Sequence, residues 1–300
     1  MAPHSERVLI TGSSGFTGRT LQSALVKKGY VVSGLTRRRD AQPWEHTVDL
    51  TSTEALPALL AEIAPDVVVH LAGIASPAHG AVAEIYNANV TGSAVLLSAL
   101  RQLARPPRLT LVASSSNVYA RGDEGRPQDE AGPLEPINDY AVSKFAVEQM
   151  CRLVASSLNI QVVRPFNYTG VGQTNAFLIP KIVEHFARRA SEIEVGDLNL
   201  DRDISDVEDT VEAYVRLIAG SAGDVLNVCS GRAIRLSSIL DILRDISGHD
   251  IAVRVNSKFV RANEPKIIVG DRTALDARVG AWPRRELRDT LEAMYRASAG

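Results

Sequence analysis

Short apolar runs alternate along this chain with longer stretches whose apolar residues recur every three or four positions. The runs predict buried strands at 7–11, 30–36, 66–71, 109–114, 160–165 and 225–229. The periodic stretches predict helices from about residue 18 onward and at 52–63, 82–103, 140–158 and 207–219. Regular alternation of strand and helix is typical of a parallel sheet with helices on both faces. We therefore expect an α/β fold with a doubly wound parallel sheet, the Rossmann fold.

Two segments, 167–204 and 232–300, break this rhythm and carry scattered arginines. The pattern predicts one Rossmann domain formed by 1–166 and 205–231, and a smaller C-terminal lobe formed by 167–204 and 232–300.

Composition narrows the class of protein. A formal net charge of −2 gives no electrostatic reason to expect nucleic acid or an anionic membrane as a partner. The longest apolar stretch, 67–75, is interrupted by His70 and is too short to span a bilayer, so we expect a cytoplasmic protein. Cys151 and Cys229 fit buried thiols better than a disulfide, and no His, Cys or carboxylate cluster has the spacing of a metal site.

Three glycines follow the first predicted strand at three-residue spacing: Gly12, Gly15 and Gly18. In the order strand, glycine turn, helix, such glycines permit a tight turn, close approach of a pyrophosphate and close helix packing. The pattern predicts a dinucleotide site, and an ordinary glycine-rich turn is the alternative.

Tyr140 and Lys144 lie four residues apart in a predicted helix, with Ser115 upstream at the end of a predicted strand. The spacing puts both side chains on one helix face, where an ammonium beside a phenol favours its ionised form. Such a phenol can exchange protons near neutral pH, and the serine can hydrogen-bond the same substrate oxygen. A surface tyrosine packed over a lysine stem is the alternative.

The residues after the second strand bear on the cofactor. An NAD site usually carries a carboxylate about twenty residues beyond the glycines, whereas Thr36-Arg37-Arg38-Arg39 occupies this stretch. Arginines there suit a 2′-phosphate, so NADP(H) is favoured over NAD(H). A solvated basic loop is the alternative.

Several motifs together resemble the extended short-chain dehydrogenase/reductases that act on nucleotide sugars. They are the segment 12–18 (Gly-Ser-Ser-Gly-Phe-Thr-Gly), Leu71-Ala72-Gly73, Asn89, Ser115 with Tyr119, Tyr140 with Lys144, and 164–167 (Arg-Pro-Phe-Asn). The resemblance covers nearly the whole chain.

The resemblance implies Tyr140 as acid/base, Ser115 as its hydrogen-bonding partner, Lys144 as the group that holds the nicotinamide ribose, and Asn89 as an organiser of the catalytic site. A helix asparagine bonded to backbone is the alternative for Asn89, and a turn or helix cap is the alternative for Asp49. The cofactor-binding residues it implies are Gly12, Ser14, Gly15, Phe16, Thr17, Gly18, Thr36, Arg37, Arg38, Asp49, Leu50, Leu71, Ala72, Gly73, Tyr140, Lys144 and Pro165.

The same resemblance makes the smaller lobe a nucleotide-sugar-binding lobe and favours a homodimer. The substrate-binding residues it implies are Ser76, Ser116, Asn117, Asn167, Arg202, Arg261 and Glu264. The planar fork of arginine suits a diphosphate, although each of the two arginines, taken alone, is more often part of a surface ion pair.

One departure from the family narrows the reaction. The 4,6-dehydratases place an Asp-Glu pair after the catalytic hydroxyl residue, whereas Ser116-Asn117 follows Ser115 here. Segments 164–173, 195–209 and 227–231 resemble the GDP-4-keto-6-deoxy-D-mannose reductases, which implies NAD(P)H-dependent reduction of a C4 ketone to GDP-rhamnose or its 4-epimer. An NAD-dependent 4-epimerase of nucleotide sugars is the alternative, and a non-catalytic dinucleotide sensor is a more distant one.

Overall fold

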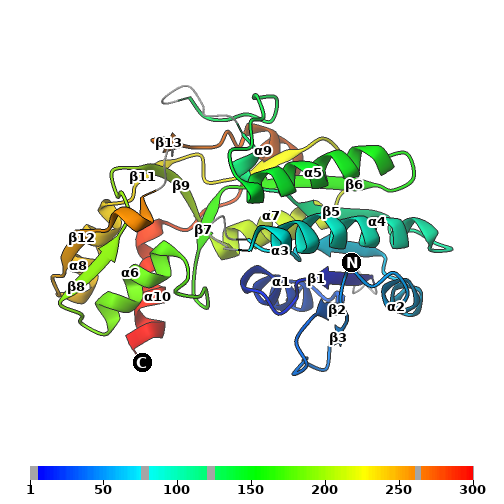
Figure 1. Ribbon diagram of the computed structural model, residues 1–300, viewed down its shortest axis with the longest axis horizontal. Coiled ribbons are helices and arrows are strands. Elements are labelled where there is room, and N and C mark those ends of the chain that lie inside the picture. The colour runs from blue at the N-terminus through cyan, green and yellow to red at the C-terminus, as the bar shows by residue number, and fades with distance from the viewer. Residues whose placement is uncertain (1–5, 76–80, 120–125, 261–264, 300) are drawn as a thin grey trace. The chain divides into compact units, whose positions relative to one another are not determined.

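The computed structural model describes residues 6–75, 81–119, 126–260 and 265–299 (Figure 1). The chain divides into two compact units. Unit 1 is built from the described residues of 1–120, 130–165 and 211–227, and unit 2 from those of 121–129, 166–210 and 228–300. The domain boundaries expected from the sequence, and the binding role of the smaller lobe, stay predictions.

The core of unit 1 is a seven-stranded sheet in the order β10-β6-β5-β4-β1-β2-β3. Its strands are β1 (Arg7–Thr11), β2 (Val31–Thr36), β3 (Glu45–Thr47), β4 (Val67–His70), β5 (Leu109–Ala113), β6 (Ile160–Pro165) and β10 (Leu226–Val228). The pairings from β3 through to β6 are all parallel. The expected parallel Rossmann sheet is confirmed.

Strand order reverses between β1 and β4, which pair side by side although some sixty residues of sequence separate them. Thr11 at the end of β1 lies opposite His70 at the end of β4. In open parallel sheets, ligands bind beyond the carboxyl ends of the strands at this reversal. The turn after Thr11 and the loop after His70 therefore border the expected ligand position.

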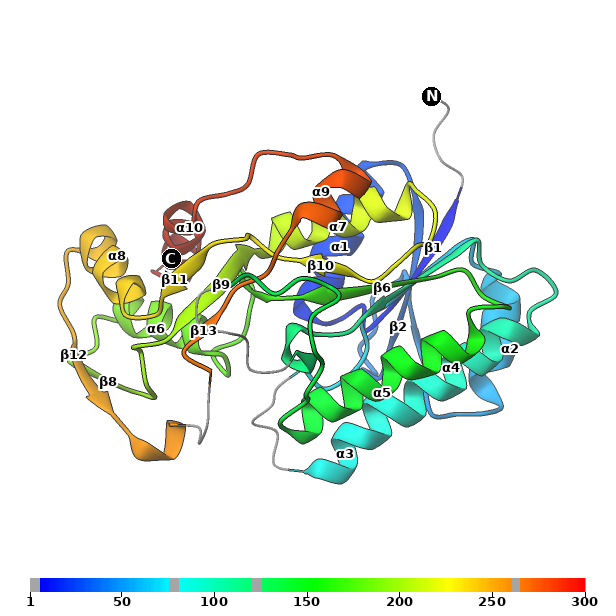
Figure 2. The same ribbon diagram turned by 90° about the horizontal axis from the view of Figure 1, so that it is seen from above.

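The helices of unit 1 cover both faces of the sheet. They are α1 (Phe16–Lys27), α2 (Ala55–Ile63), α3 (Val82–Tyr86), α4 (Gly92–Gln102), α5 (Asp139–Val154) and α7 (Val207–Ile218), whose first four residues belong to unit 2. Helices α2, α4 and α5 pack on one face (Figure 2), where their apolar side chains join Leu9, Val68 and Val112 in a single cluster. Helix α1 packs against β1 and β2 with Leu21 and Leu25 fully buried, outside that cluster.

The stretch expected to be one helix over 82–103 is interrupted. A π-helical turn, η1 (Asn87–Thr91), lies between α3 and α4 and contains the buried Asn89. Such turns insert an extra residue into a helix and occur often at functional sites. Apolar periodicity does not distinguish this turn from regular helix.

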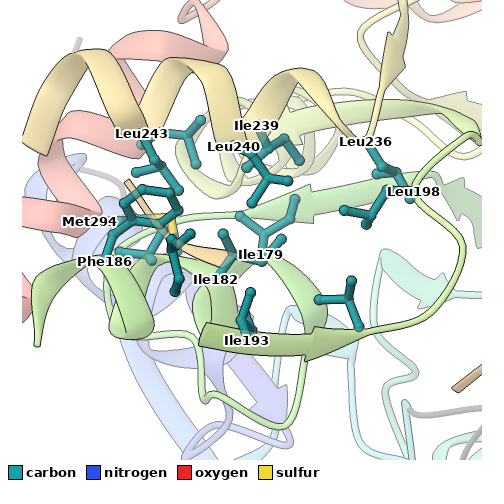
Figure 3. Close-up of a cluster of buried hydrophobic side chains, with 14 of the residues drawn as sticks. Ile179, Ile182, Phe186, Ile193, Leu198, Leu236, Ile239, Leu240, Leu243 and Met294 are labelled. Carbon is teal, nitrogen blue, oxygen red and sulfur yellow. The ribbon is translucent and has the colours of Figure 1, made fainter. Parts of the chain in front are cut away.

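Unit 2 contains six strands of two to six residues among its described residues. Strands β7 (Asn167–Thr169), β9 (Asp201–Asp206), β11 (Ala233–Arg235) and β13 (Ile267–Ile268) form one sheet, while β8 (Glu192–Val195) pairs with β12 (Ala252–Val255). Helices α6 (Leu178–Ala187), α8 (Ser238–Ser247) and α10 (Leu287–Ala299) share a hydrophobic core in which Ile182, Phe186, Leu243 and Met294 point toward one another (Figure 3). The remaining helices are α9 (Thr273–Val279) and the 3₁₀ turns η2 (Ser116–Val118) and η3 (Ser257–Phe259), of which η2 belongs to unit 1.

Cys151 and Cys229 are buried free thiols, as expected. Within the described ranges, no helix is both long enough and apolar enough to cross a membrane.

Candidate active site

The start of helix α5 positions the predicted proton-transfer residues. Asn138 caps the helix by accepting a hydrogen bond from the Ala141 backbone at 2.9 Å, and Asp139 adds a negative charge to the first turn. Tyr140 and Lys144 follow on the buried face and are 7% and 8% exposed. Both residues therefore lie on the side of the helix that packs against the rest of the protein.

Lys144 reaches the end of strand β5. Its Nζ donates a hydrogen bond to the Ala113 carbonyl at 3.0 Å. Burial lowers the pKa of Lys144 from 10.5 to about 8, because the charged ammonium loses solvent. At pH 7 the side chain is still mainly protonated, so this position holds a fixed cation.

Ser115 lies two residues beyond the carbonyl that Lys144 binds and is the N-cap of the 3₁₀ turn η2. Its Oγ accepts hydrogen bonds from the backbone N–H of Asn117 at 3.2 Å and from the Asn117 side-chain amide at 3.0 Å. Both bonds use the oxygen as acceptor, which leaves the hydroxyl hydrogen to donate. Asn117, expected to bind substrate, thus also orients Ser115.

Asn89 joins the loop after β4 to helix α5. Its Oδ1 accepts from the Ile74 backbone N–H at 2.7 Å, and its Nδ2 donates to the Ile74 carbonyl at 3.2 Å and to Ser143 Oγ at 2.9 Å. Ser143 Oγ in turn donates to the Tyr140 carbonyl at 2.7 Å. Asn89 therefore does bond to backbone, as its alternative role supposed, but to the loop after β4. Its bond to Ser143 connects it to the backbone of Tyr140.

Gly73 permits this arrangement. Its φ is +148°, and a Cβ at this position would lie 2.6 Å from Asn89 Oδ1. A larger residue here would displace the asparagine from the Ile74 backbone.

The glycine turn has the features that a dinucleotide site needs. Gly12 has a φ of +71°, and a Cβ there would lie 2.8 Å from the Ala72 backbone nitrogen, so the turn passes directly against the loop after β4. Helix α1 begins at Phe16 with Gly15 as N-cap and with no side-chain cap. An uncapped helix N-terminus beside a glycine turn suits a pyrophosphate. Ser14, Thr17 and Gly18 belong to the same turn and first helical residues.

The two arginines expected to bind the cofactor follow β2, and their surroundings differ. Thr36 is buried, and its Oγ1 lies 2.9 Å from Ser14 Oγ. Arg38 forms an ion pair with Asp40, with Nε donating at 2.9 Å, whereas the Arg37 side chain is exposed. Of these two arginines, Arg38 is thus the one that the carboxylate of Asp40 holds in an ion pair.

Asp49 is exposed and accepts hydrogen bonds from the backbone N–H and hydroxyl of Thr51 at 2.9 and 2.8 Å. These bonds, with a smaller effect of the Arg37 charge, lower the pKa of Asp49. The turn considered as its alternative role is therefore present. Leu50 follows it, and Leu71 and Ala72 hydrogen-bond to Thr11 across the strand reversal. Pro165 ends β6.

The predicted substrate residues are divided between the units. Ser116, in unit 1, is buried beside Ser115. In unit 2, Asn167 is exposed at the start of β7, and Arg202 is buried in β9, where its Nη1 donates to the carbonyls of Asp201 and Lys266. Ser76, Arg261 and Glu264 lie outside the described residues.

Two buried polar groups close to these residues were not predicted from the sequence. Glu148 accepts a hydrogen bond from Ser114, the neighbour of Ser115, at 2.5 Å and pairs with Arg164. His70 lies between the hydroxyls of Thr11 and Ser93. Glu148 and His70 each interrupt an apolar pattern in the sequence, and this interruption is the only sequence signal of their buried polar contacts.

Across the part of the chain that the structure describes, no group of three or more His, Cys, Asp or Glu residues is arranged to hold a metal ion. The strand reversal, the glycine turn, the serine beyond β5 and the tyrosine and lysine on the buried face of α5 define the class: a dinucleotide-binding α/β protein of the Rossmann type.

Comparisons with known proteins specify the family. Residues 8–229 match the model of the NAD-dependent epimerase/dehydratase family, and the chain belongs to this family. It is 32% identical to a GDP-6-deoxy-D-mannose reductase of Pseudomonas aeruginosa, over 97% of this chain and 96% of the relative. It is 31% identical to a GDP-6-deoxy-D-talose 4-dehydrogenase of Aggregatibacter actinomycetemcomitans, over 97% of both chains.

Solved structures agree in fold. A candidate epimerase from Burkholderia cenocepacia superposes with a TM-score of 0.91 at 43% identity and covers 99% of both chains. RMD from Pseudomonas aeruginosa, in complex with NADPH, superposes with a TM-score of 0.87 at 32% identity, over 98% of this chain and 99% of that one.

Proposed function

We propose that this protein reduces the C4 ketone of a nucleotide-linked 4-keto-6-deoxyhexose with NAD(P)H, and that its substrate is GDP-4-keto-6-deoxy-D-mannose. The product is then GDP-rhamnose or its 4-epimer. The observation that carries the proposal is the placement of three residues. Ser115 follows the end of β5, and Tyr140 and Lys144 lie on the buried face of helix α5, from which Lys144 Nζ donates to the Ala113 carbonyl at the end of β5. Two relatives that act on GDP-linked 6-deoxyhexoses, by their names, match over nearly the full chain.

In the proposed reaction Tyr140 gives its phenolic proton to the oxygen of the C4 carbonyl as that oxygen becomes an alkoxide. Ser115 donates its hydroxyl hydrogen to the same oxygen, because Asn117 already occupies the acceptor side of Oγ. Lys144 supplies the buried positive charge that favours the ionised phenol after proton transfer. A bound nicotinamide would supply the hydride that reduces the carbonyl carbon.

Several residues of unit 1 are proposed to hold the cofactor. Gly12 to Gly18 and the N-terminus of α1 would bind the pyrophosphate, and Leu71 to Gly73 would run beneath the cofactor. Lys144 would also hold the nicotinamide ribose, while Asp49 and Leu50 would contact the adenine. NADP(H) is the proposed preference because Arg37 and Arg38 stand where NAD sites usually carry a carboxylate.

For the substrate, the residues proposed to bind the nucleotide sugar are those that the family resemblance implies: Ser76, Ser116, Asn117, Asn167, Arg202, Arg261 and Glu264. The cytoplasmic location and the homodimer remain predictions.

The absence of an acid after Ser115 separates this proposal from dehydration. Elimination of water needs a carboxylic acid and a base beside the sugar, and Ser116-Asn117 provides neither. GDP-mannose itself is therefore expected to be inert until a separate dehydratase has made the ketone.

A stoichiometry assay tests the function. Purified protein is incubated with NADPH and with GDP-4-keto-6-deoxy-D-mannose, its UDP- and dTDP-linked counterparts, or GDP-mannose. We expect ketone loss to equal NADPH oxidation for the GDP-linked ketone and no reaction with GDP-mannose. Interconversion of a sugar nucleotide without net oxidation of added NADPH would replace this proposal with the 4-epimerase.

A further inference from the structure

His70 ends strand β4 inside unit 1 and is buried, with 3% of its surface exposed. Its Nδ1 lies 2.7 Å from Thr11 Oγ1 and its Nε2 lies 2.8 Å from Ser93 Oγ. Both partners are themselves buried. The ring therefore bridges the end of β1 to helix α4 with both of its nitrogens in use.

The direction of each hydrogen bond follows from the atoms at the two ends. Ser93 Oγ donates to the Asn89 carbonyl, which can only accept, and a hydroxyl has one hydrogen. Ser93 must therefore accept from His70, so the ring carries its hydrogen on Nε2. Nδ1 is then an acceptor, and Thr11 Oγ1 donates to it.

The series of hydrogen bonds continues beyond Thr11, and we call it the His70 hydrogen-bond series. The Ala72 backbone N–H donates to Thr11 Oγ1 at 3.1 Å, which gives that hydroxyl one bond accepted and one donated. The resulting sequence of donors runs from Ala72 through Thr11 to His70, and from His70 through Ser93 to Asn89. It joins the loop after β4 to the carbonyl of the π-helical turn η1.

Only a neutral imidazole can form the His70 hydrogen-bond series, because it accepts at Nδ1 and donates at Nε2. An imidazolium would donate from both nitrogens. Burial, with a smaller effect of the Lys144 charge, lowers the pKa of His70 to about 3. The ring is therefore neutral at physiological pH.

We infer that His70, in its Nε2–H tautomer, is a positioning residue that fixes the π-helical turn of Asn89 against the loop after β4. Asn89 is bonded through Ser143 to the backbone of Tyr140, so the placement of the phenol depends on the same series of hydrogen bonds. The inference rests on the proposed function only for its kinetic consequence. The tautomer and the local order are properties of the protein without substrate.

The first test needs no substrate. Nitrogen-15 NMR of histidine-labelled protein, with the His70 signal assigned by its loss in His70→Gln, reports which ring nitrogen carries the hydrogen. We expect the Nε2–H form alone, and we expect Ser93→Ala to introduce the Nδ1–H form because Nε2 then loses its acceptor. Hydrogen exchange of the Ile74 amide, bound to Asn89, should be faster in Ser93→Ala.

The second test separates positioning from general stability. Ser93→Ala and His70→Leu interrupt the His70 hydrogen-bond series, whereas His70→Gln keeps one acceptor and one donor at this position. Ser98→Ala, on the exposed side of α4, is the control. We expect kcat to fall about ten- to a hundredfold in the first two, with KM for NADPH nearly unchanged, because small misplacements of a proton donor have effects of this size. His70→Gln should recover part of kcat.

An Nδ1–H tautomer in the wild type, or unchanged Ile74 exchange in Ser93→Ala, would overturn the inference. So would a kcat in folded His70→Leu equal to that of the wild type. Failure of the wild type to reduce any nucleotide-linked ketone would instead refute the proposed function, and the NMR and exchange results would still decide the role of His70.

Discussion

Arg164 and Glu148 form a bidentate ion pair inside unit 1, with Nε and Nη2 donating to the two carboxylate oxygens at 2.9 and 2.7 Å. Both side chains are only 1% exposed. Glu148 also accepts from Ser114, and Arg164 Nη1 donates to the Tyr119 hydroxyl at 3.0 Å. The pair therefore links helix α5 and strand β6 to the segment that carries Ser115.

Removing one member of this pair should destabilise the protein strongly. Arg164→Met leaves a buried, unpaired carboxylate, which typically costs about 3–5 kcal/mol. We expect the double variant with Glu148→Leu to lose less than the sum of the two single losses, because it leaves no isolated charge. Urea unfolding measures each free energy.

The control is the half-exposed pair of Arg216 and Glu212, where Glu212→Gln should change the free energy of unfolding by less than about 1 kcal/mol. If the free energy of unfolding fell equally at the buried and the half-exposed ion pair, burial would not be the reason for the large loss expected at Arg164 and Glu148.

Lys144 should make the free energy of unfolding rise with pH in the alkaline range. Burial lowers its folded-state pKa to about 8, while the unfolded value is near 10.5. Below pH 8 the lysine is charged in both states and its burial destabilises the fold fully. As pH rises from 8 to 10.5 the folded state loses its proton first, so the penalty disappears and the free energy of unfolding rises.

The matched comparison is Lys144→Met, which lacks the titrating group. The stability of the wild type relative to this variant should rise across that window by on the order of 2–3 kcal/mol. Urea unfolding of both proteins at several pH values measures the difference. A difference that stays constant or falls with pH would show that Lys144 is solvated.

Arg37 should determine cofactor preference more than Arg38 does, because Asp40 already pairs with Arg38. Arg37→Gln is expected to raise KM for NADPH about tenfold, the size of one lost charge-assisted hydrogen bond, and to change KM for NADH little. Arg38→Gln is the matched variant and should have the smaller effect. Equal changes for both cofactors in Arg37→Gln would mean that Arg37 does not meet a 2′-phosphate.

Tyr140→Phe should remove most turnover while NADPH binding, measured by fluorescence titration, stays near that of the wild type. Only the hydroxyl is lost, and general acid catalysis by a positioned group contributes about 10²–10⁴-fold. A variant with near-normal kcat would eliminate Tyr140 as the proton donor.

The Rossmann sheet could be predicted from sequence because most of its strands are rich in apolar residues, and 7–11 and 160–165 were predicted with the observed bounds. Strand β3 was missed because Glu45, His46 and Thr47 are polar or charged. The strands of unit 2 are two to six residues long, and those of four residues or more include charged residues, so they give no long apolar run to detect.

Ser115, Tyr140, Lys144 and the glycine turn could be singled out because their spacing along the chain carries the chemistry. The hydrogen bonds of His70 to Thr11 and Ser93 could not, because these residues are distant in sequence and meet only through strand order and helix packing. The pairing of Arg38 with Asp40 is local, yet it depends on side-chain conformations that residue types alone do not determine.

Deuterium transfer tests the central claim most directly. Wild-type protein is given GDP-4-keto-6-deoxy-D-mannose and NADPH carrying deuterium on the transferring face of the nicotinamide, and the sugar is analysed by mass spectrometry and proton NMR. Reduction predicts a product heavier by a single deuterium located at C4, in an amount equal to the NADP formed. Product without deuterium at C4, or sugar interconversion while the labelled NADPH persists, would contradict the account.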